Sequence, residues 1–140
     1  MQMQQSEVKR KHLPGTKEFV FLQGNQVVAK ERIDASGSIH VEGRIPDGVV
    51  KSYYEDDQGN ETQALFAEWH YENGKLEGIS RIYYENGLLE EEVVYACGRI
   101  QEVLKKHYDE NGQLSFETRF DCSSGTITYA HHEKVITAVA

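Results

Sequence analysis

The stretch that decides the fold is Tyr-Tyr-Glu-Asn-Gly-Leu-Leu at residues 83–89. A similar phrase stands at residues 71–76, Tyr-Glu-Asn-Gly-Lys-Leu, and another at residues 108–114, Tyr-Asp-Glu-Asn-Gly-Gln-Leu. Asn followed by Gly tolerates the positive φ angles that a two-residue type I′ hairpin needs at both central positions. We therefore predict a tight hairpin of this type at each of the three Asn-Gly pairs.

The three phrases belong to an internal repeat. Gly87 is followed by Gly112, and Tyr84 by Tyr108, each after a period of about 25 residues. A period of this length holds two strands and two turns. The spacing therefore predicts a chain of hairpins, each followed by another of nearly the same length.

Apolar and polar residues alternate between the turns, which is the pattern of a strand with one buried face. A helix would send residues i and i+2 to opposite sides, so the same pattern excludes helices here. Three sets of apolar residues are each expected to share a face: Leu114, Phe116 and Phe120; Leu65, Ala67, Trp69 and Tyr71; and Ile100, Leu104 and Tyr108.

The first half of the chain shows the same pattern more weakly. Short alternating or apolar segments predict strands at residues 19–22, 26–29, 38–41 and 49–54, and a last strand at residues 135–139, after a turn at 131–134. Residues 1–16 are polar and show no alternation, so we expect them to be disordered or loosely docked. Residues 17–140 are expected to form one domain.

The recurring phrase resembles the MORN repeat (membrane occupation and recognition nexus) in its bacterial variant form. The residues that carry the resemblance are those of 83–89 with Glu92, Tyr95 and Gly98, and a second set in 108–120 with Phe120 in place of Tyr. The resemblance implies an all-β fold: an elongated, single-layer antiparallel meander of stacked hairpins. With the repeat period it predicts about ten strands. It implies no chemistry, since such repeats generally mediate protein association.

Aromatic and acidic residues are the candidate binding residues. Tyr and Trp are frequent anchors of protein interfaces, and an acidic cluster attracts a basic partner. The alternatives are that the aromatic rings are the repeat's own packing and that the acids form a solvated face. In the Tyr53–Tyr54 and Tyr83–Tyr84 pairs, neighbours point to opposite faces, which leaves one of each pair for an exposed patch. The candidate set is Tyr53, Tyr54, Trp69, Tyr71, Tyr83, Tyr84, Glu90, Glu91 and Tyr108.

Composition and motifs narrow the function classes. With 39% hydrophobic and 27% charged residues, the chain resembles neither a membrane protein nor a disordered one. Its net charge of −8 disfavours nucleic acid and anionic membranes as partners. No catalytic motif is recognisable, so we expect no catalytic residue and no enzyme. The Asn111-Gly112 loop lacks the acids of a calcium loop, so we expect no metal and no cofactor.

Cys97 and Cys122 are separated by one full repeat period. Equivalent positions of a meander are two strands apart, roughly 9–10 Å, which is too far for a disulfide. We predict that both are free thiols. Residues 1–12 carry no apolar run, so we expect a cytoplasmic protein, with a removed export signal left open.

Three functions remain. The first is a non-catalytic protein-interaction module, for which a free sheet edge also offers pairing into a homodimer. The second is an antitoxin or immunity protein that neutralises a toxin, because the resemblance extends to bacterial relatives described in that role. The third, against the charge argument, is an adaptor for lipid surfaces.

Overall fold

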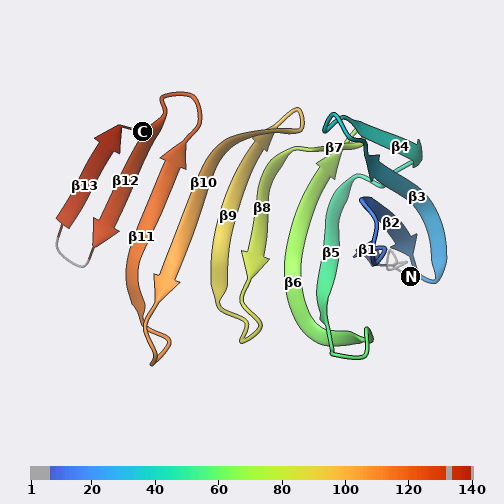
Figure 1. Ribbon diagram of the computed structural model, residues 1–140, viewed down its shortest axis with the longest axis horizontal. Coiled ribbons are helices and arrows are strands. Elements are labelled where there is room, and N and C mark those ends of the chain that lie inside the picture. The colour runs from blue at the N-terminus through green and yellow to red at the C-terminus, as the bar shows by residue number, and fades with distance from the viewer. Residues whose placement is uncertain (1–6, 132–133, 140) are drawn as a thin grey trace, which may run out of the picture.

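The computed structural model describes residues 7–131 and 134–139, and they form one open sheet (Figure 1). Thirteen strands compose it, more than the ten expected, because the sequence pattern missed short strands. The strands are β1 Val8–His12, β2 Glu18–Gln23, β3 Gln26–Ile33, β4 Ile39–Gly43, β5 Gly48–Glu55, β6 Glu61–Glu72, β7 Lys75–Leu76, β8 Gly78–Tyr83, β9 Leu89–Ala96, β10 Arg99–Tyr108, β11 Leu114–Asp121, β12 Thr126–His131 and β13 Lys134–Val139.

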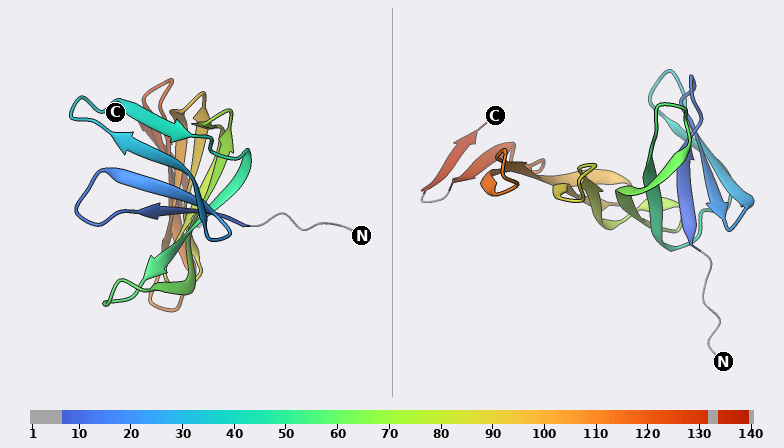
Figure 2. Two further views of the ribbon diagram at one scale, coloured as in Figure 1. Left: turned by 90° about the vertical axis from the view of Figure 1, so that its right-hand side faces the viewer. Right: turned by 90° about the horizontal axis from the view of Figure 1, so that it is seen from below.

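The second half of the molecule is the expected antiparallel meander. From β5 onward the main strands pair in chain order, and the short β7 pairs only with β6. The strand expected at residues 135–139 is confirmed as β13. Of the turn expected at 131–134, residues 132–133 lie outside the described residues. The molecule is elongated, and Figure 2 shows the later strands as a single thin layer.

The N-terminal strand breaks the simple meander. Residues 8–12 form β1, so the expectation of disorder over 1–16 is wrong for this part, while residues 1–6 lie outside the described residues. β1 pairs antiparallel with β2 and parallel with β5, in the register Val8↔Val50 and Lys9↔Lys51. The sequence pattern does not predict this strand. Its five residues, VKRKH, contain one apolar residue, Val8, so they show no alternation of apolar and polar side chains.

The pairing forces the first half to curl. In a flat sheet β4 and β5 would be four strand spacings apart, roughly 19 Å. The connection from Gly43 to Gly48 has five residue steps and reaches at most about 18 Å fully extended. The strands β1–β4 therefore bend out of the plane of β5–β13, as both views of Figure 2 show. The expected single layer holds only for the second half.

The hydrophobic core lies inside this curl. Phe21 on β2 meets Tyr71 on β6 edge to face at 5.4 Å, although three strand spacings separate the two strands. Ile45 in the β4–β5 connection is 1% exposed and closes the cluster, which comprises Val8, Phe21, Ala29, Ile45, Val50 and Tyr71. We call the face of the sheet that carries this core the inner face and the opposite one the outer face.

A β-bulge in β10 changes one predicted face. The shared face of Ala67, Trp69 and Tyr71 is confirmed, since Ala67 and Tyr71 are both buried and Trp69 packs on the core. The prediction is wrong for Leu65, because a register shift at Phe66 pairs it with Tyr53 on the opposite face. Ile100, however, pairs with Tyr95 on the inner face, whereas Leu104 pairs with Glu92 on the outer face. The register shift between Ile100 and Glu102 separates them, and a bulge of one residue leaves no periodic trace in a sequence.

Candidate functional site

Three loops that connect repeat strands lie side by side at the same end of the strands, at the bottom of Figure 1. We call this end of the strands the loop edge of the sheet. The loops join β5 to β6, β8 to β9 and β10 to β11, and they share one geometry. In each, a glycine with positive φ donates its N–H to the carbonyl three residues earlier, at 2.9 Å for Gly59, 2.9 Å for Gly87 and 3.0 Å for Gly112. These are three-residue loops in which a left-handed glycine follows a type I turn.

This geometry corrects the predicted turn type. At Asn86-Gly87 and Asn111-Gly112 only the glycine has positive φ, so neither is a type I′ hairpin. Asn73-Gly74 does have positive φ at both residues, 52° and 78°, as predicted. The same is true of Cys97-Gly98, 51° and 81°, a pair that carries no turn signal of this kind in its sequence.

Aspartates hold two of the three edge loops in shape. Oδ1 of Asp56 accepts the N–H groups of Gln58 and Asn60 at 2.9 and 2.8 Å. Oδ1 of Asp109 accepts those of Asn111 and Gln113, both at 2.9 Å. These bonds fix the loop backbone and leave the second carboxylate oxygen of each aspartate for solvent or a partner.

Four half-buried aromatic rings lie beside these loops, and we call them the aromatic row: Phe66, Tyr54, Tyr84 and Tyr108. Tyr54 contacts Phe66 edge to face at 5.2 Å, and Tyr84 contacts Tyr108 in the same way at 5.9 Å. Two of the tyrosine hydroxyls donate to the backbone of the next hairpin. That of Tyr54 donates to the Tyr83 carbonyl at 2.6 Å, and that of Tyr84 to the Lys106 carbonyl at 3.3 Å. The row thus links successive repeats.

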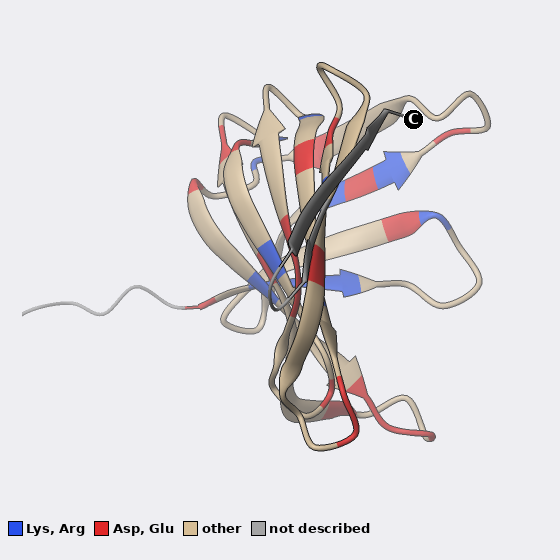
Figure 3. Cartoon of the chain, turned by 90° about the vertical axis from the view of Figure 1, so that its left-hand side faces the viewer, with Lys and Arg blue, Asp and Glu red and all other residues tan. Residues whose placement is uncertain are grey.

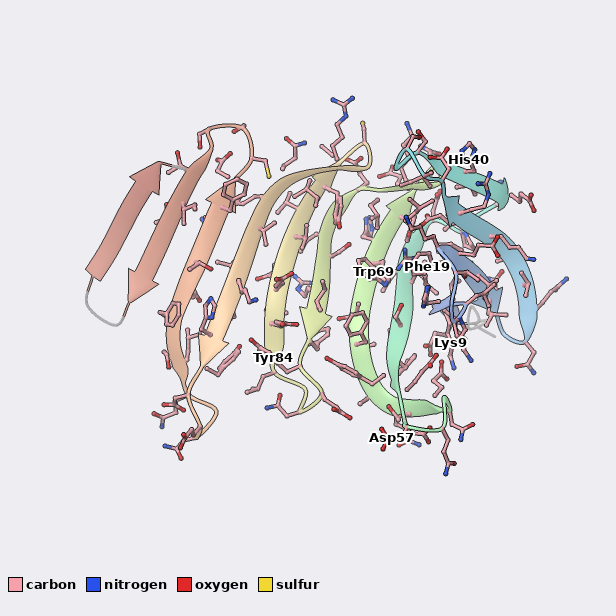
Figure 4. All side chains as sticks on the ribbon, in the orientation of Figure 1. Lys9, Phe19, His40, Asp57, Trp69 and Tyr84 are labelled. Atoms are coloured by element: carbon pink, nitrogen blue, oxygen red, sulfur yellow. The ribbon has the colours of Figure 1, made fainter. Side chains whose placement is uncertain are left out.

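Carboxylates surround the aromatic row. Burial raises the pKa of Tyr54, and the nearby Glu90 and Glu85 raise it further. No Lys or Arg occurs in the three loops. We call these loops and their acids the acidic edge: Glu55, Asp56, Asp57, Glu61, Glu85, Glu90, Asp109 and Glu110. Figure 3 shows acidic residues gathered on these loops, and Figure 4 labels Asp57 and Tyr84 at this edge.

A cavity of about 400 Å³ opens at the β5–β6 end of the aromatic row. Tyr54 and Phe66 line one part of it, and Pro14 and Phe19 line another. Its charged lining residues include both signs, Arg10 and Lys11 with Glu55 and Glu61. It is the recess nearest to the acidic edge among those found in the described residues.

The structure separates the predicted site residues into several places. Tyr54, Tyr84, Tyr108 and Glu90 come together at the acidic edge. Glu91 lies on the inner face, with its carboxylate 3.9 Å from the ammonium group of Lys105.

Tyr53 and Tyr83 are each held by a carboxylate outside their own strand. The Tyr53 hydroxyl donates to Glu7 at 2.6 Å, and the Tyr83 hydroxyl donates to Glu68. Burial first, and then these carboxylates, raise the pKa of both tyrosines to about 12. Each pair ties neighbouring elements together.

Trp69 and Tyr71 lie on β6, on the face that the curled strands cover. Tyr71 is 2% exposed and is part of the core, so it offers no surface to a partner. Burial raises its pKa far above the ordinary value, and the nearby Arg10 lowers it only in part. The Trp69 indole donates to the Ser52 hydroxyl at 2.9 Å.

Arg10 has a role that was not expected from the sequence. Its guanidinium lies 3.7 Å from the ring centre of Phe19 and 4.9 Å from that of Trp69, and 3.2 Å from the carboxylate of Glu31. Figure 4 labels Phe19 and Trp69 at this place. Glu31 is buried, and the Arg10 Nε and the Tyr71 hydroxyl have no hydrogen-bond partner among the described residues. The arrangement fastens β1 to the core.

Other kinds of site were sought over the part of the chain that the structure describes. No group of three or more His, Cys, Asp or Glu side chains there is placed to hold a metal ion. No helix there is long and apolar enough to cross a membrane. Cys97 and Cys122 are exposed free thiols in turns at the edge opposite the acidic edge.

Comparison with known proteins gives a family match over two segments and a weak structural likeness. The family described as MORN repeat variant matches residues 76–96 and 101–121. No curated protein matches the chain. A solved structure described as accessory secretory protein 1, 2 and 3 in Streptococcus pneumoniae is similar with a TM-score of 0.33 and 11% identity, over 91% of this chain and 19% of that chain.

The matched segments coincide with structural repeats. Residues 76–96 run from β7 through β9, and residues 101–121 comprise most of β10 and all of β11. Each segment contains one edge loop and its glycine, Gly87 or Gly112. The chain therefore contains two adjacent segments, residues 76–96 and 101–121, that match the MORN repeat variant.

Proposed function

We propose that this protein is a non-catalytic interaction module that binds a basic segment of another protein along the acidic edge. The family supports the broad class, since MORN repeats are commonly modules for interaction with proteins or membranes. The observation that carries the specific proposal is that eight carboxylates and the aromatic row lie along one edge, whose three loops contain no Lys or Arg. Of the eight, Glu61 is already paired with Lys9, at 2.6 Å.

The chemistry of this edge suits Arg and Lys side chains. Carboxylates attract them over about 10 Å at moderate salt. Arg also stacks on aromatic faces, which adds about 0.5–2 kcal/mol per contact as desolvation increases. Asp57, Glu85 and Glu110 have no hydrogen-bond partner among the described residues, so they are the carboxylates most available to a partner.

The same charge argues against an anionic lipid surface, because a row of carboxylates repels phosphate headgroups. A toxin with a basic substrate-binding surface is one partner with the required chemistry. Covering that surface would neutralise it, so the antitoxin role is a narrower form of this proposal.

A matched pair of triple variants tests the acidic edge. The first variant combines Asp57→Asn, Glu85→Gln and Glu110→Gln. The control combines Glu18→Gln, Glu42→Gln and Glu72→Gln, which removes three negative charges outside the three edge loops. The probe is a fluorescent arginine-rich peptide, measured by anisotropy at low and moderate salt.

We expect the edge variant to bind the peptide at least ten-fold more weakly and the control to bind almost as tightly as the parent. Equal losses in the two variants would mean that only net charge matters, which contradicts the proposal. Binding to phosphatidylserine vesicles that is stronger than binding to the peptide would contradict it as well.

A further inference from the structure

The inner face of β8–β11 continues the apolar core beyond the curl. Four residues on it are direct cross-strand partners in succession, Ser80 with Val93, Val93 with Val103, and Val103 with Phe120. Side chains that are direct partners lie on the same face of a sheet. The row therefore runs across four strands on the same face as Val50 of β5 and Tyr71 of β6, which the curled strands cover.

The two faces of these strands differ sharply in charge. The outer face has ion pairs between Arg81 and Glu92 at 3.3 Å, Glu102 and Arg119 at 2.8 Å, and Lys106 and Glu117 at 2.6 Å. On the inner face of β9–β11, alternation and register place one acid, Glu91, one lysine, Lys105, and one histidine, His107, whose ring stacks on Phe116. A sheet with one charged and one apolar face usually covers the apolar one.

In the curled half that cover is present, because β2 and β3 pack Phe21 and Ala29 over the inner face. Over β9–β11 no second layer of the described residues covers it, as the thin layer in Figure 2 shows. Phe120 is 37% exposed and Ile100 is 45% exposed on this uncovered part. The core is thus continuous with an open apolar surface.

We infer that a second copy of this chain covers the inner face of β9–β11, so that two molecules pack sheet on sheet around a two-fold axis. Two copies with a net charge of −8 each repel one another at most orientations. The inner face is the place where this repulsion is least, since its two charges are opposite in sign.

The charges also favour a two-fold arrangement. In a symmetric dimer a residue i of one copy meets j of the other, and j meets i. Lys105 and Glu91 lie 3.9 Å apart within one copy and are partly exposed, so in a two-fold arrangement Lys105 of each copy can also approach Glu91 of the other. Val103 and Phe120 would pack beside this group of four charges. This surface is separate from the acidic edge and does not depend on the function proposed there.

Two isoleucines with the same exposure give a matched test. Ile100 is on the inner face, opposite Tyr95, and Ile79 is on the outer face, opposite Val94. Both are 45% exposed. Ile100→Glu and Ile79→Glu therefore add the same charge to similar environments on opposite faces. The full chain and both variants are compared by light scattering after gel filtration and by sedimentation velocity over a hundred-fold range of concentration.

We expect the parent and Ile79→Glu to reach twice the mass of the single chain as concentration rises. Ile100→Glu should require at least ten-fold higher concentration to do so, with an unchanged far-ultraviolet dichroism spectrum. Phe120→Glu is the second inner-face variant, and it should behave like Ile100→Glu. A parent that stays monomeric throughout would overturn the inference. So would a dimer that Ile79→Glu weakens equally, or one that neither inner-face variant weakens.

Discussion

Gly43 ends β4 at the point where the chain leaves the curl. Its φ is 79°, and a Cβ built on it would lie 2.4 Å from the carbonyl oxygen of Val28. Gly59 in the β5–β6 loop has nearly the same φ, 81°, but a Cβ there meets nothing within 4 Å. Both positions require a residue that tolerates positive φ, but only Gly43 also lacks room for a Cβ atom.

Alanine at each position should therefore cost different amounts of stability. For Gly59→Ala we expect a loss of about 1–2 kcal/mol, which is the usual cost of a left-handed residue with a Cβ. Gly43→Ala should lose clearly more, since the backbone of Val28 must also move. Urea unfolding followed by far-ultraviolet dichroism measures both. Equal losses would show that the close contact at Gly43 relaxes freely.

At this scale the sequence predicted residue types better than their geometry. The glycine of each Asn-Gly pair does adopt positive φ, as expected. The asparagine does so only at Asn73, because a loop one residue longer places Asn86 and Asn111 in the right-handed region. Loop length depends on the register of the flanking strands, which a dipeptide does not encode.

The strand β1 is the element that the sequence did not reveal. Its attachment depends on Arg10, whose partner Glu31 is buried on β3. Removing one member of a buried ion pair leaves the other without a counter-charge and typically costs about 3–5 kcal/mol. Replacing both by apolar residues avoids that cost.

We expect Arg10→Met to destabilise the protein by about 3–5 kcal/mol and the double variant with Glu31→Met to regain most of that loss. Arg119→Met is the control, since its pair with Glu102 is solvent-exposed and should be worth at most about 1 kcal/mol. Fluorescence of Trp69, the single tryptophan, reports unfolding next to Arg10. A double variant no more stable than Arg10→Met would contradict this role of the pair.

The Tyr53–Glu7 and Tyr83–Glu68 pairs join other elements, and their contribution to the stability of the folded protein depends on pH. The pKa of Tyr53 and that of Tyr83 are raised to about 12, so the folded state favours the neutral phenol. The contribution is fully present below the ordinary value of about 10 and is lost as pH rises through about 12. Absorbance at 295 nm should show tyrosines that ionise late, and Tyr83→Phe should remove one of them. Full ionisation near pH 10 in the folded protein would contradict the shift.

Across the whole molecule, burial is uneven. The buried residues among those described extend from Val8 to Val93, and none occurs from residue 94 to residue 128. Stability in a repeat array is largely local, since each repeat contacts only its neighbours. We expect hydrogen exchange to be slowest in β2, β5 and β6 and faster by at least ten-fold in β10 and β11. Uniform protection across the sheet would contradict this gradient.

The repeat period predicted the hairpins and the order of the later strands, and the family resemblance implied the all-β class and the elongated shape. Of the candidate binding residues, three tyrosines and Glu90 lie at one edge, and their role in binding stays a prediction. The curl was not predictable, because it follows from the pairing of β1 with β5, between residues more than forty positions apart. Phe66 was missed because its alternation with Ala67 and Trp69 places it outside the core stripe.

The pairing of β1 with β5 determines at which end of the array an extra repeat can be inserted. One extra repeat unit inserted after Asp121 would only add two strands to an open ribbon. The same unit inserted before Gly48 would have to separate β5 from β1 and reopen the compact end. Duplication events in the ancestry of such a gene are therefore tolerated downstream of the curl, and lengthened descendants should differ in their later hairpins while they keep the segment from β1 to β5.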